Sequence, residues 1–134
     1  MGEILLFNIH DPEKRTAIRL TAMRLGIPCR EIPREQQGIT IAELLSAKQT
    51  ESFVAGTESF EEELMLMNAL RQEDFRKLLD LLRNEGQIVR LKAVVTEHKR
   101  NWTPTQLCKA LKVEEDAIRR RIQQKEKPQH RKKK

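Results

Sequence analysis

The chain has 134 residues, of which 38% are hydrophobic and 34% are charged, and its formal net charge is +6. This length is typical of one domain that buries its core without the help of disulfides or metals. No apolar run approaches the roughly 18 residues that a membrane-spanning helix needs, so we expect no contact with a membrane.

The cysteines and the N-terminus indicate the compartment. Cys29 and Cys108 stand alone, without the spacing of a metal knuckle or a disulfide framework. Residues 1–15 place no basic leader before their apolar stretch, which predicts a first strand and not a signal peptide. We therefore expect a cytoplasmic protein with no metal and no cofactor.

The positive charge is concentrated at the C-terminus. Residues 124–134 contain six Lys or Arg and one Glu, a net charge of +5, which leaves +1 for residues 1–123. A run of this kind is typical of a solvated end. We expect a single domain over 1–123, followed by a basic disordered tail over 124–134.

The first half predicts two strands and two helices. Ile4–Ile9 is a continuous apolar run, as in a strand that is buried on both faces. Asp11 is placed to cap the following helix, and Gly26 is placed to end it. The more polar segment 29–33 is bounded by prolines, which favours an edge strand. A short helix then starts at Thr40.

The same order follows a linker over 48–62. A second apolar strand at 64–70 leads to a helix at 73–85, which ends at Gly86. A strand at 88–96 and a helix from Thr103 to about residue 123 complete the unit. The residues expected to bury the two amphipathic helices against the sheet are Ile18, Ala22 and Leu25 in the first and Leu78, Leu79 and Leu82 in the second.

The two halves, 3–47 and 63–123, align at an offset of 60 residues. The alignment pairs Asn8 with Asn68, Gly26 with Gly86 and Arg30 with Arg90. Three extra residues in the second turn then pair Thr40 with Thr103. The pattern predicts a duplicated β-α-β-α unit.

Two such units predict an α/β (α+β) fold with a ferredoxin-like sheet and added helices. The two most apolar strands would form the central pair, and the polar strands 29–33 and 88–96 would form the edges. The two amphipathic helices would cover one face. The alternative is a doubly wound parallel sheet with helices on both faces.

Part of the second half is similar to a known family. The segment Arg83–Glu115 carries the run Lys92-Ala93-Val94-Val95-Thr96, then Trp102-Thr103, Leu107 and Glu114-Glu115. On these residues it resembles the uncharacterised bacterial family called domain of unknown function 3783. The resemblance implies no activity, ligand or partner.

The turn 96–102 is the densest group of polar and aromatic residues. It follows a predicted strand and precedes a helix, where free backbone N–H groups favour anions. Lys99 and Arg100 suit a carboxylate or phosphate, and Trp102 suits stacking on a ring. The structural alternative is that Thr103 caps the helix and Trp102 packs onto it. The candidate ligand-binding residues of this turn are Thr96, His98, Lys99, Arg100, Asn101 and Trp102.

Asn8 and Asn68 complete the candidate ligand site. They occupy equivalent places at the ends of the two apolar strands, and a two-fold relation between the units would bring their amides together. The structural alternative is that each asparagine bonds to the backbone of its own turn.

The C-terminal segment suggests a second function. Residues 104–122 have a faint helix-turn-helix spacing, but Lys112 replaces the turn glycine, and one long helix fits the pattern better. Weak, salt-dependent contact with nucleic acid is the alternative function. Its candidate residues are Arg119, Arg120, Arg121, Arg131, Lys132, Lys133 and Lys134.

No sequence motif of a catalytic site is present, so we assign no catalytic residue and expect a protein that is not an enzyme. The sequence predicts a small binding or regulatory module. Its candidate partners are a small anionic ligand, a protein or a second copy of the chain.

Overall fold

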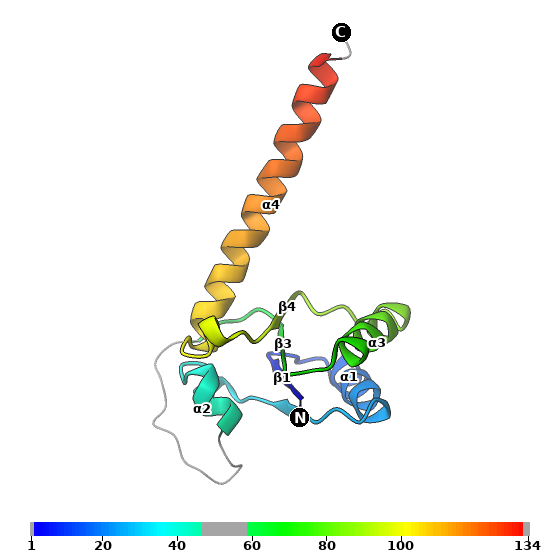
Figure 1. Ribbon diagram of the computed structural model, residues 1–134, viewed down its shortest axis with the longest axis vertical. Helices are drawn as coiled ribbons and strands as arrows, with labels where there is room; N and C mark the ends of the chain where they lie inside the picture. The colour runs from blue at the N-terminus through cyan, green and yellow to red at the C-terminus, as the bar shows by residue number, and fades with distance from the viewer. Residues whose placement is uncertain (1, 47–58, 133–134) are drawn as a thin grey trace.

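The computed structural model describes residues 2–46 and 59–132, and of residues 124–132 it describes the helical backbone alone. Each half contains a strand, a helix, a strand, a 3-10 turn and a helix, in that order (Figure 1). The first half comprises β1 (Glu3–Phe7), α1 (Pro12–Arg24), β2 (Cys29–Glu31), the turn Arg34–Gln36 and α2 (Ile41–Ser46). The second comprises β3 (Leu64–Asn68), α3 (Gln72–Asn84), β4 (Leu91–Val94), the turn Glu97–Lys99 and α4 (Pro104–Lys132).

The four strands form one mixed sheet in the order β2-β1-β3-β4. The central strands β1 and β3 are antiparallel, with Leu5 opposite Leu66. Each edge strand runs parallel to the central strand of its own half, with Leu5 opposite Arg30 and Leu66 opposite Ala93. The sequence-based prediction of an α/β fold is confirmed, and the two apolar strands are central as expected.

The strand order differs from the predicted ferredoxin-like sheet. In a split β-α-β unit, a strand from the other unit separates the two parallel strands. Here β1 lies directly beside β2, and β3 lies directly beside β4. The alternative of an all-parallel sheet does not hold either, because β1 and β3 are antiparallel. Short connections around each helix return the chain to the neighbouring strand, which accounts for the direct pairing.

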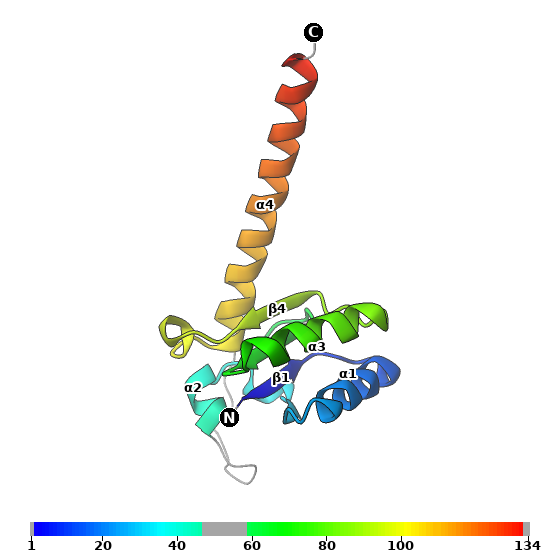
Figure 2. The same ribbon diagram turned by 45° about the vertical axis from the view of Figure 1, so that its right-hand side comes forward.

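Helices cover both faces of the sheet (Figures 1 and 2). On one face, Ile4 and Leu6 pack with Ile18 of α1 and Leu78 of α3. On the other face, Leu5 and Phe7 belong to a cluster that also contains Ile41 and Leu44 of α2 and Leu107 and Cys108 of α4. Alternate residues of a strand point to opposite faces, and this explains why β1 is continuously apolar over Ile4–Phe7 and β3 over Leu64–Met67.

The two predicted helix ends are confirmed. Gly26 and Gly86 follow α1 and α3 with φ values of 70° and 72°, a conformation that glycine adopts without steric cost. Burial differs from the prediction at two positions. Ile18, Ala22, Leu78 and Leu82 are buried, whereas Leu25 and Leu79 are only partly buried at the edge of the core.

The correspondence between the halves also differs from the predicted alignment. The residue with positive φ after the first strand is Asn8 (60°), and after the third strand it is Ala69 (56°), so Asn8 matches Ala69 and not Asn68. Arg30 lies opposite Leu5 inside β2, whereas Arg90 precedes β4. Two of the three extra residues therefore lie between Gly86 and β4 and the third lengthens β4 itself, so none lies in the turn after β4. Common ancestry of the halves stays a prediction.

Helix α4 starts on the sheet and projects away from it as a single rod (Figures 1 and 2). The sequence-based prediction ended this helix near residue 123, but its backbone continues to Lys132, in a segment rich in the helix formers Lys, Arg, Gln and Glu. Among the helices of the described residues, none has the length and apolar character needed to cross a membrane.

Candidate functional site

The turn 96–102 lies at the base of α4. Thr96, His98 and Asn101 are exposed, whereas Lys99, Arg100 and Trp102 are half-buried. The Lys99 ammonium lies 5.6 Å from the centre of the Trp102 ring, and the His98 ring lies 6.5 Å from it. The structure therefore brings Lys99, His98 and Trp102 together, with Lys99 in position for a cation–π contact.

The backbone donors at the start of α4 are already bonded. The Thr103 N–H donates to Gln106 Oε1 (2.9 Å), and the Gln106 N–H donates to Thr103 Oγ1 (3.1 Å). This reciprocal pair is a capping box, and it confirms Thr103 as the cap. The Thr105 N–H donates to the Gln37 carbonyl (3.3 Å). The backbone N–H groups of Thr103, Thr105 and Gln106, which the sequence suggested as an anion site, therefore already donate hydrogen bonds within the protein.

The same turn also caps α2. The carbonyl oxygens of Trp102 and Arg100 accept hydrogen bonds from the N–H groups of Ile41 and Ala42, both at 2.8 Å. Trp102 packs against the core cluster that contains Phe7 and Leu107. These contacts give the turn a structural role in joining the two halves, and ligand binding by its side chains stays a prediction.

Asn8 and Asn68 do not form one site. Asn68 lies opposite Glu3 at one end of the β1–β3 pair, whereas Asn8 follows Phe7 at the other end. The predicted proximity of the two amides is therefore wrong. Because β1 and β3 are antiparallel, their C-terminal ends lie at opposite ends of the central strand pair.

Asn8 belongs instead to a network that the sequence did not indicate. Its amide nitrogen donates to the carbonyls of Phe60 (2.8 Å) and Glu62 (3.0 Å). Its amide oxygen accepts from Gln37 Nε2 (2.9 Å), and Gln37 Oε1 accepts from the Phe60 N–H (2.9 Å). The fully buried Gln37 also accepts from Thr105 Oγ1 through its carbonyl. The network ties β1, the segment before β3 and α4 together and gives Asn8 a structural role, while ligand binding by Asn8 stays a prediction.

A second polar group fastens α4 to the segment before β3. Glu62 accepts hydrogen bonds from Lys112 Nζ (2.7 Å) and Cys108 Sγ (3.5 Å). The Lys112 hydrogen bond is the main reason why the pKa of Glu62 falls to about 2. Burial, the largest cause, and the Glu62 carboxylate raise the pKa of Cys108 to about 11.

The other thiol behaves in the same way. Burial raises the pKa of Cys29 to about 11, although Arg19 opposes this shift. A thiol is a nucleophile only as the thiolate, so neither cysteine is activated near neutral pH. Within the described ranges, no three His, Cys, Asp or Glu side chains are grouped so that they would hold a metal ion.

Helix α4 carries an apolar stripe. At 100° per residue, Leu107, Leu111, Ile118 and Ile122 fall within an arc of about 60°. Leu107 is buried on the sheet and Leu111 is partly buried there, whereas Ile118 and Ile122 are 54% and 53% exposed. The face that anchors the helix to the domain therefore continues beyond it without a partner among the described residues.

The predicted arginine cluster lies on this projecting part. Arg119 pairs with Glu115 (3.6 Å) and Asp116 (3.8 Å) on its own helix. Arg120 and Arg121 are exposed, and no carboxylate of the described residues lies within 4 Å of either. The continuous helix excludes the helix-turn-helix interpretation. The side chains of Arg131 and Lys132, and residues Lys133 and Lys134, lie outside the described part.

Comparison with known proteins confirms the family resemblance of the second half. The model of a family described as a domain of unknown function (DUF3783) matches residues 63–118. This segment contains β3, α3, β4 and the first half of α4. Neither the curated proteins nor the solved structures include a match to the chain.

Proposed function

We propose that this protein is a small cytoplasmic binding module, not an enzyme, and that it self-associates through the projecting part of α4. The main support for this proposal is that the apolar stripe of α4 continues into the part of the helix that projects from the domain. Ile118 and Ile122 lie on the face that Leu107 and Leu111 use to pack on the domain, but they are more than half exposed. Exposed apolar residues aligned on one helix face are typical of an interface.

The charge pattern favours a second copy as the partner. Going along the helix, the acidic run Glu114–Asp116 is followed by the basic run Arg119–Arg121. In an antiparallel pair centred near Ile118, the acidic run of each copy faces the basic run of the other. A parallel pair would place like charges side by side. The pattern therefore favours an antiparallel arrangement.

The described chemistry gives no support to catalysis. Both thiols are held protonated near neutral pH, as their raised pKa values of about 11 indicate. Asp11, which lies beside His10, is bonded to the N–H groups of Glu13 and Lys14 as the cap of α1. These groups serve the fold, and a binding role remains the simpler proposal.

Sedimentation of the full chain at low and high salt tests self-association. We expect a reversible dimer that Ile118→Asp and Ile122→Asp each weaken at least tenfold, because each places a charge in the apolar contact. Val113→Asp is the matched control. Val113 is 68% exposed on the same helix, but it lies about 140–180° around the helix from Ile118 and Ile122.

A monomer at the highest accessible concentration would refute self-association. A dimer that Val113→Asp weakens as much as Ile118→Asp would refute the stripe as its interface. If a different protein binds and its binding depends on Ile118 and Ile122, the surface on α4 is an interface, but its partner is that protein and not a second copy of the chain.

Nucleic-acid contact is the second candidate. Arg120 and Arg121 are exposed and have no carboxylate of the described residues within 4 Å, and the basic segment 124–134 follows them. Binding to phosphates would be independent of base sequence and would weaken steeply with salt. A comparison of the full chain with a chain ending at Gln123, on DNA and on RNA, tests it. Equal affinity of the two chains, or no binding by either at low salt, would rule out the segment 124–134 as the anchor for nucleic acid.

A further inference from the structure

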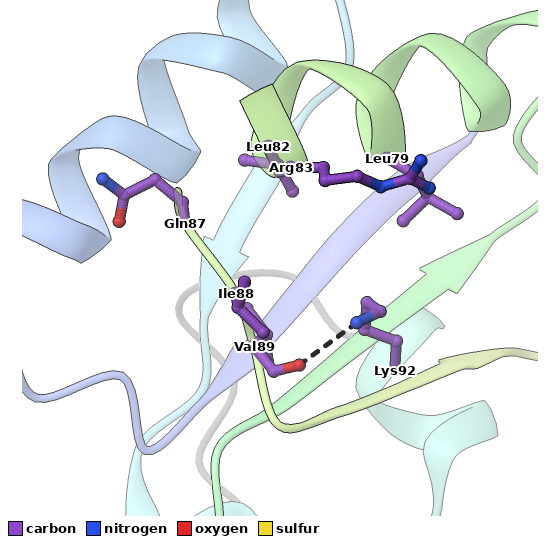
Figure 3. A pocket seen from close by; sticks show the side chains of 7 residues that line it. All are labelled: Leu79, Leu82, Arg83, Gln87, Ile88, Val89 and Lys92. Atoms are coloured by element: carbon purple, nitrogen blue, oxygen red, sulfur yellow. Dashed lines mark hydrogen bonds between the residues drawn. The ribbon is translucent and has the colours of Figure 1, made fainter. Parts of the chain in front are cut away.

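A cavity of about 250 Å³ lies between α3 and the edge strand β4 (Figure 3). Its apolar walls come from Leu79 and Leu82 of α3 and from Ile88 and Val89 of the connection to β4. Arg83 and Lys92 supply two cations to its lining. It lies on the α1–α3 face, since Leu82 and Val89 belong to the core cluster on that face.

We propose that this cavity binds a small amphipathic carboxylate, with its alkyl chain against Leu82 and Ile88 and its head on Lys92. Ile88 is 66% exposed, so a bound chain would cover apolar surface that now faces water. A mainly apolar wall with a few polar groups that fix orientation is typical of a small-molecule site.

Lys92 is placed to take the carboxylate. Within the described part of the chain, its ammonium donates one hydrogen bond, to the Val89 carbonyl at 3.2 Å. An ammonium has three donors, so two remain for a ligand. No carboxylate of the described residues lies within 4 Å of Lys92, whereas Arg83 has Asp80 at 4.0 Å. The cavity thus has an unneutralised cation next to apolar walls, which suits an amphipathic anion.

The cavity lies where the two halves of the chain differ. Between Gly26 and β2 there are two residues, Ile27 and Pro28, but between Gly86 and β4 there are four, 87–90. This longer connection supplies Ile88 and Val89 to the wall. The cavity therefore depends on the longer connection before β4, which is a place where the second half differs from the first.

The volume sets the length of the alkyl chain. At roughly 30 Å³ for each water-sized group, about 250 Å³ accommodates about eight such groups. A carboxylate with a chain of about six to eight carbons fits this space. Octanoate is therefore the probe, with octanol as the neutral analogue and acetate as the head group alone.

Amide chemical shifts of the full-length chain, titrated with each compound, test the proposal. We expect saturable 1:1 binding of octanoate, weaker binding of octanol and none of acetate, with shifts at Ile88 and Lys92. Trp102 should not respond, because it packs on the opposite face of the sheet.

Variants separate the two parts of the site. Lys92→Met should weaken octanoate at least tenfold while changing octanol little, and Lys92→Gln should do the same. Ile88→Ser should weaken both compounds. Lys109→Met, on an exposed lysine of α4 outside this cavity, is the control and should change neither.

Three results would overturn the proposal. The first is the absence of saturable octanoate binding to a chain whose melting curve is native. The second is octanoate binding that survives in both Lys92→Met and Ile88→Ser. The third is octanoate binding that shifts only residues 96–102. Each of these results leaves self-association through α4 untouched, because Ile118 and Ile122 take no part in the cavity.

Discussion

The buried amide of Gln37 offers the sharpest test of what joins the two halves. Its side chain is fully buried, and it bonds to Asn8 Oδ1 and to the Phe60 N–H, both at 2.9 Å. Gln37→Leu keeps nearly the same volume, so it removes the two hydrogen bonds without leaving a large cavity. The backbone carbonyl of residue 37, which accepts from Thr105, is retained.

The expected loss follows from the groups left behind. The Phe60 N–H becomes an unpaired buried donor, which costs about 1–3 kcal/mol. Asn8 is only half-buried, so water can replace its lost partner and the cost there is about 1 kcal/mol. The free energy of unfolding should therefore fall by about 2–4 kcal/mol, which most domains of this size survive.

Urea unfolding followed by circular dichroism measures this loss. With a slope near 2 kcal/mol per molar urea, the midpoint should fall by about 1–2 M. Gln36→Leu is the matched control, because Gln36 is half-buried and its side chain has no hydrogen bond to the described residues. If Gln37→Leu moves the midpoint no more than Gln36→Leu, the network does not stabilise the fold and the reasoning is refuted.

Three further predictions concern single positions. Leu78→Ala should lower the free energy of unfolding, measured in the same urea assay, by about 2–5 kcal/mol, because Leu78 is fully buried. The control is Leu20→Ala, which should cost under about 1 kcal/mol because Leu20 is 48% exposed. Gly86→Ala should cost about 1 kcal/mol through its φ of 72° alone, because no described atom beyond the neighbouring residues lies within 4 Å of the added methyl group. A loss near zero would contradict this strain. Lys112→Met should destabilise the chain at neutral pH, and unfolding measured in pH steps should show the difference from the natural chain shrinking as the pH falls from 4.5 towards 2. The sign follows because Lys112 is the main cause that lowers the folded pKa of Glu62 from its ordinary 4.5 to about 2. The stabilisation by this pair is therefore present above pH 4.5 and is lost as Glu62 protonates. A difference that is constant with pH would contradict the assignment.

The sequence pointed to one of the candidate sites but gave no signal for the others. The turn 96–102 could be identified, because its residues are consecutive and its neighbours Thr103 and Gln106 carry a local capping pattern. Gln37 could not be identified, since an isolated glutamine in a polar turn carries no periodic or spacing signal. The cavity beside β4 was likewise invisible, because Leu82 and Lys92 come from different elements and meet only in the folded chain.

The sequence by itself determined which elements form and where most of the helices begin and end, although it placed the end of α4 too early. Asp11, Thr40 and Thr103 cap helices and Gly26 and Gly86 end them, because caps and positive φ depend on residues close together in the chain. The same is true of the central strands, whose continuous apolar runs require burial on both faces.

Only the tertiary structure decided how these elements are joined. The direct pairing of β1 with β2 and of β3 with β4, the separation of Asn8 from Asn68 and the Asn8–Gln37 bond all depend on residues far apart in the sequence. Local pattern leaves strand order open, because the same apolar strands satisfy burial in either arrangement. The register of the antiparallel β1–β3 pair then sets which side chains meet at each end of these two strands.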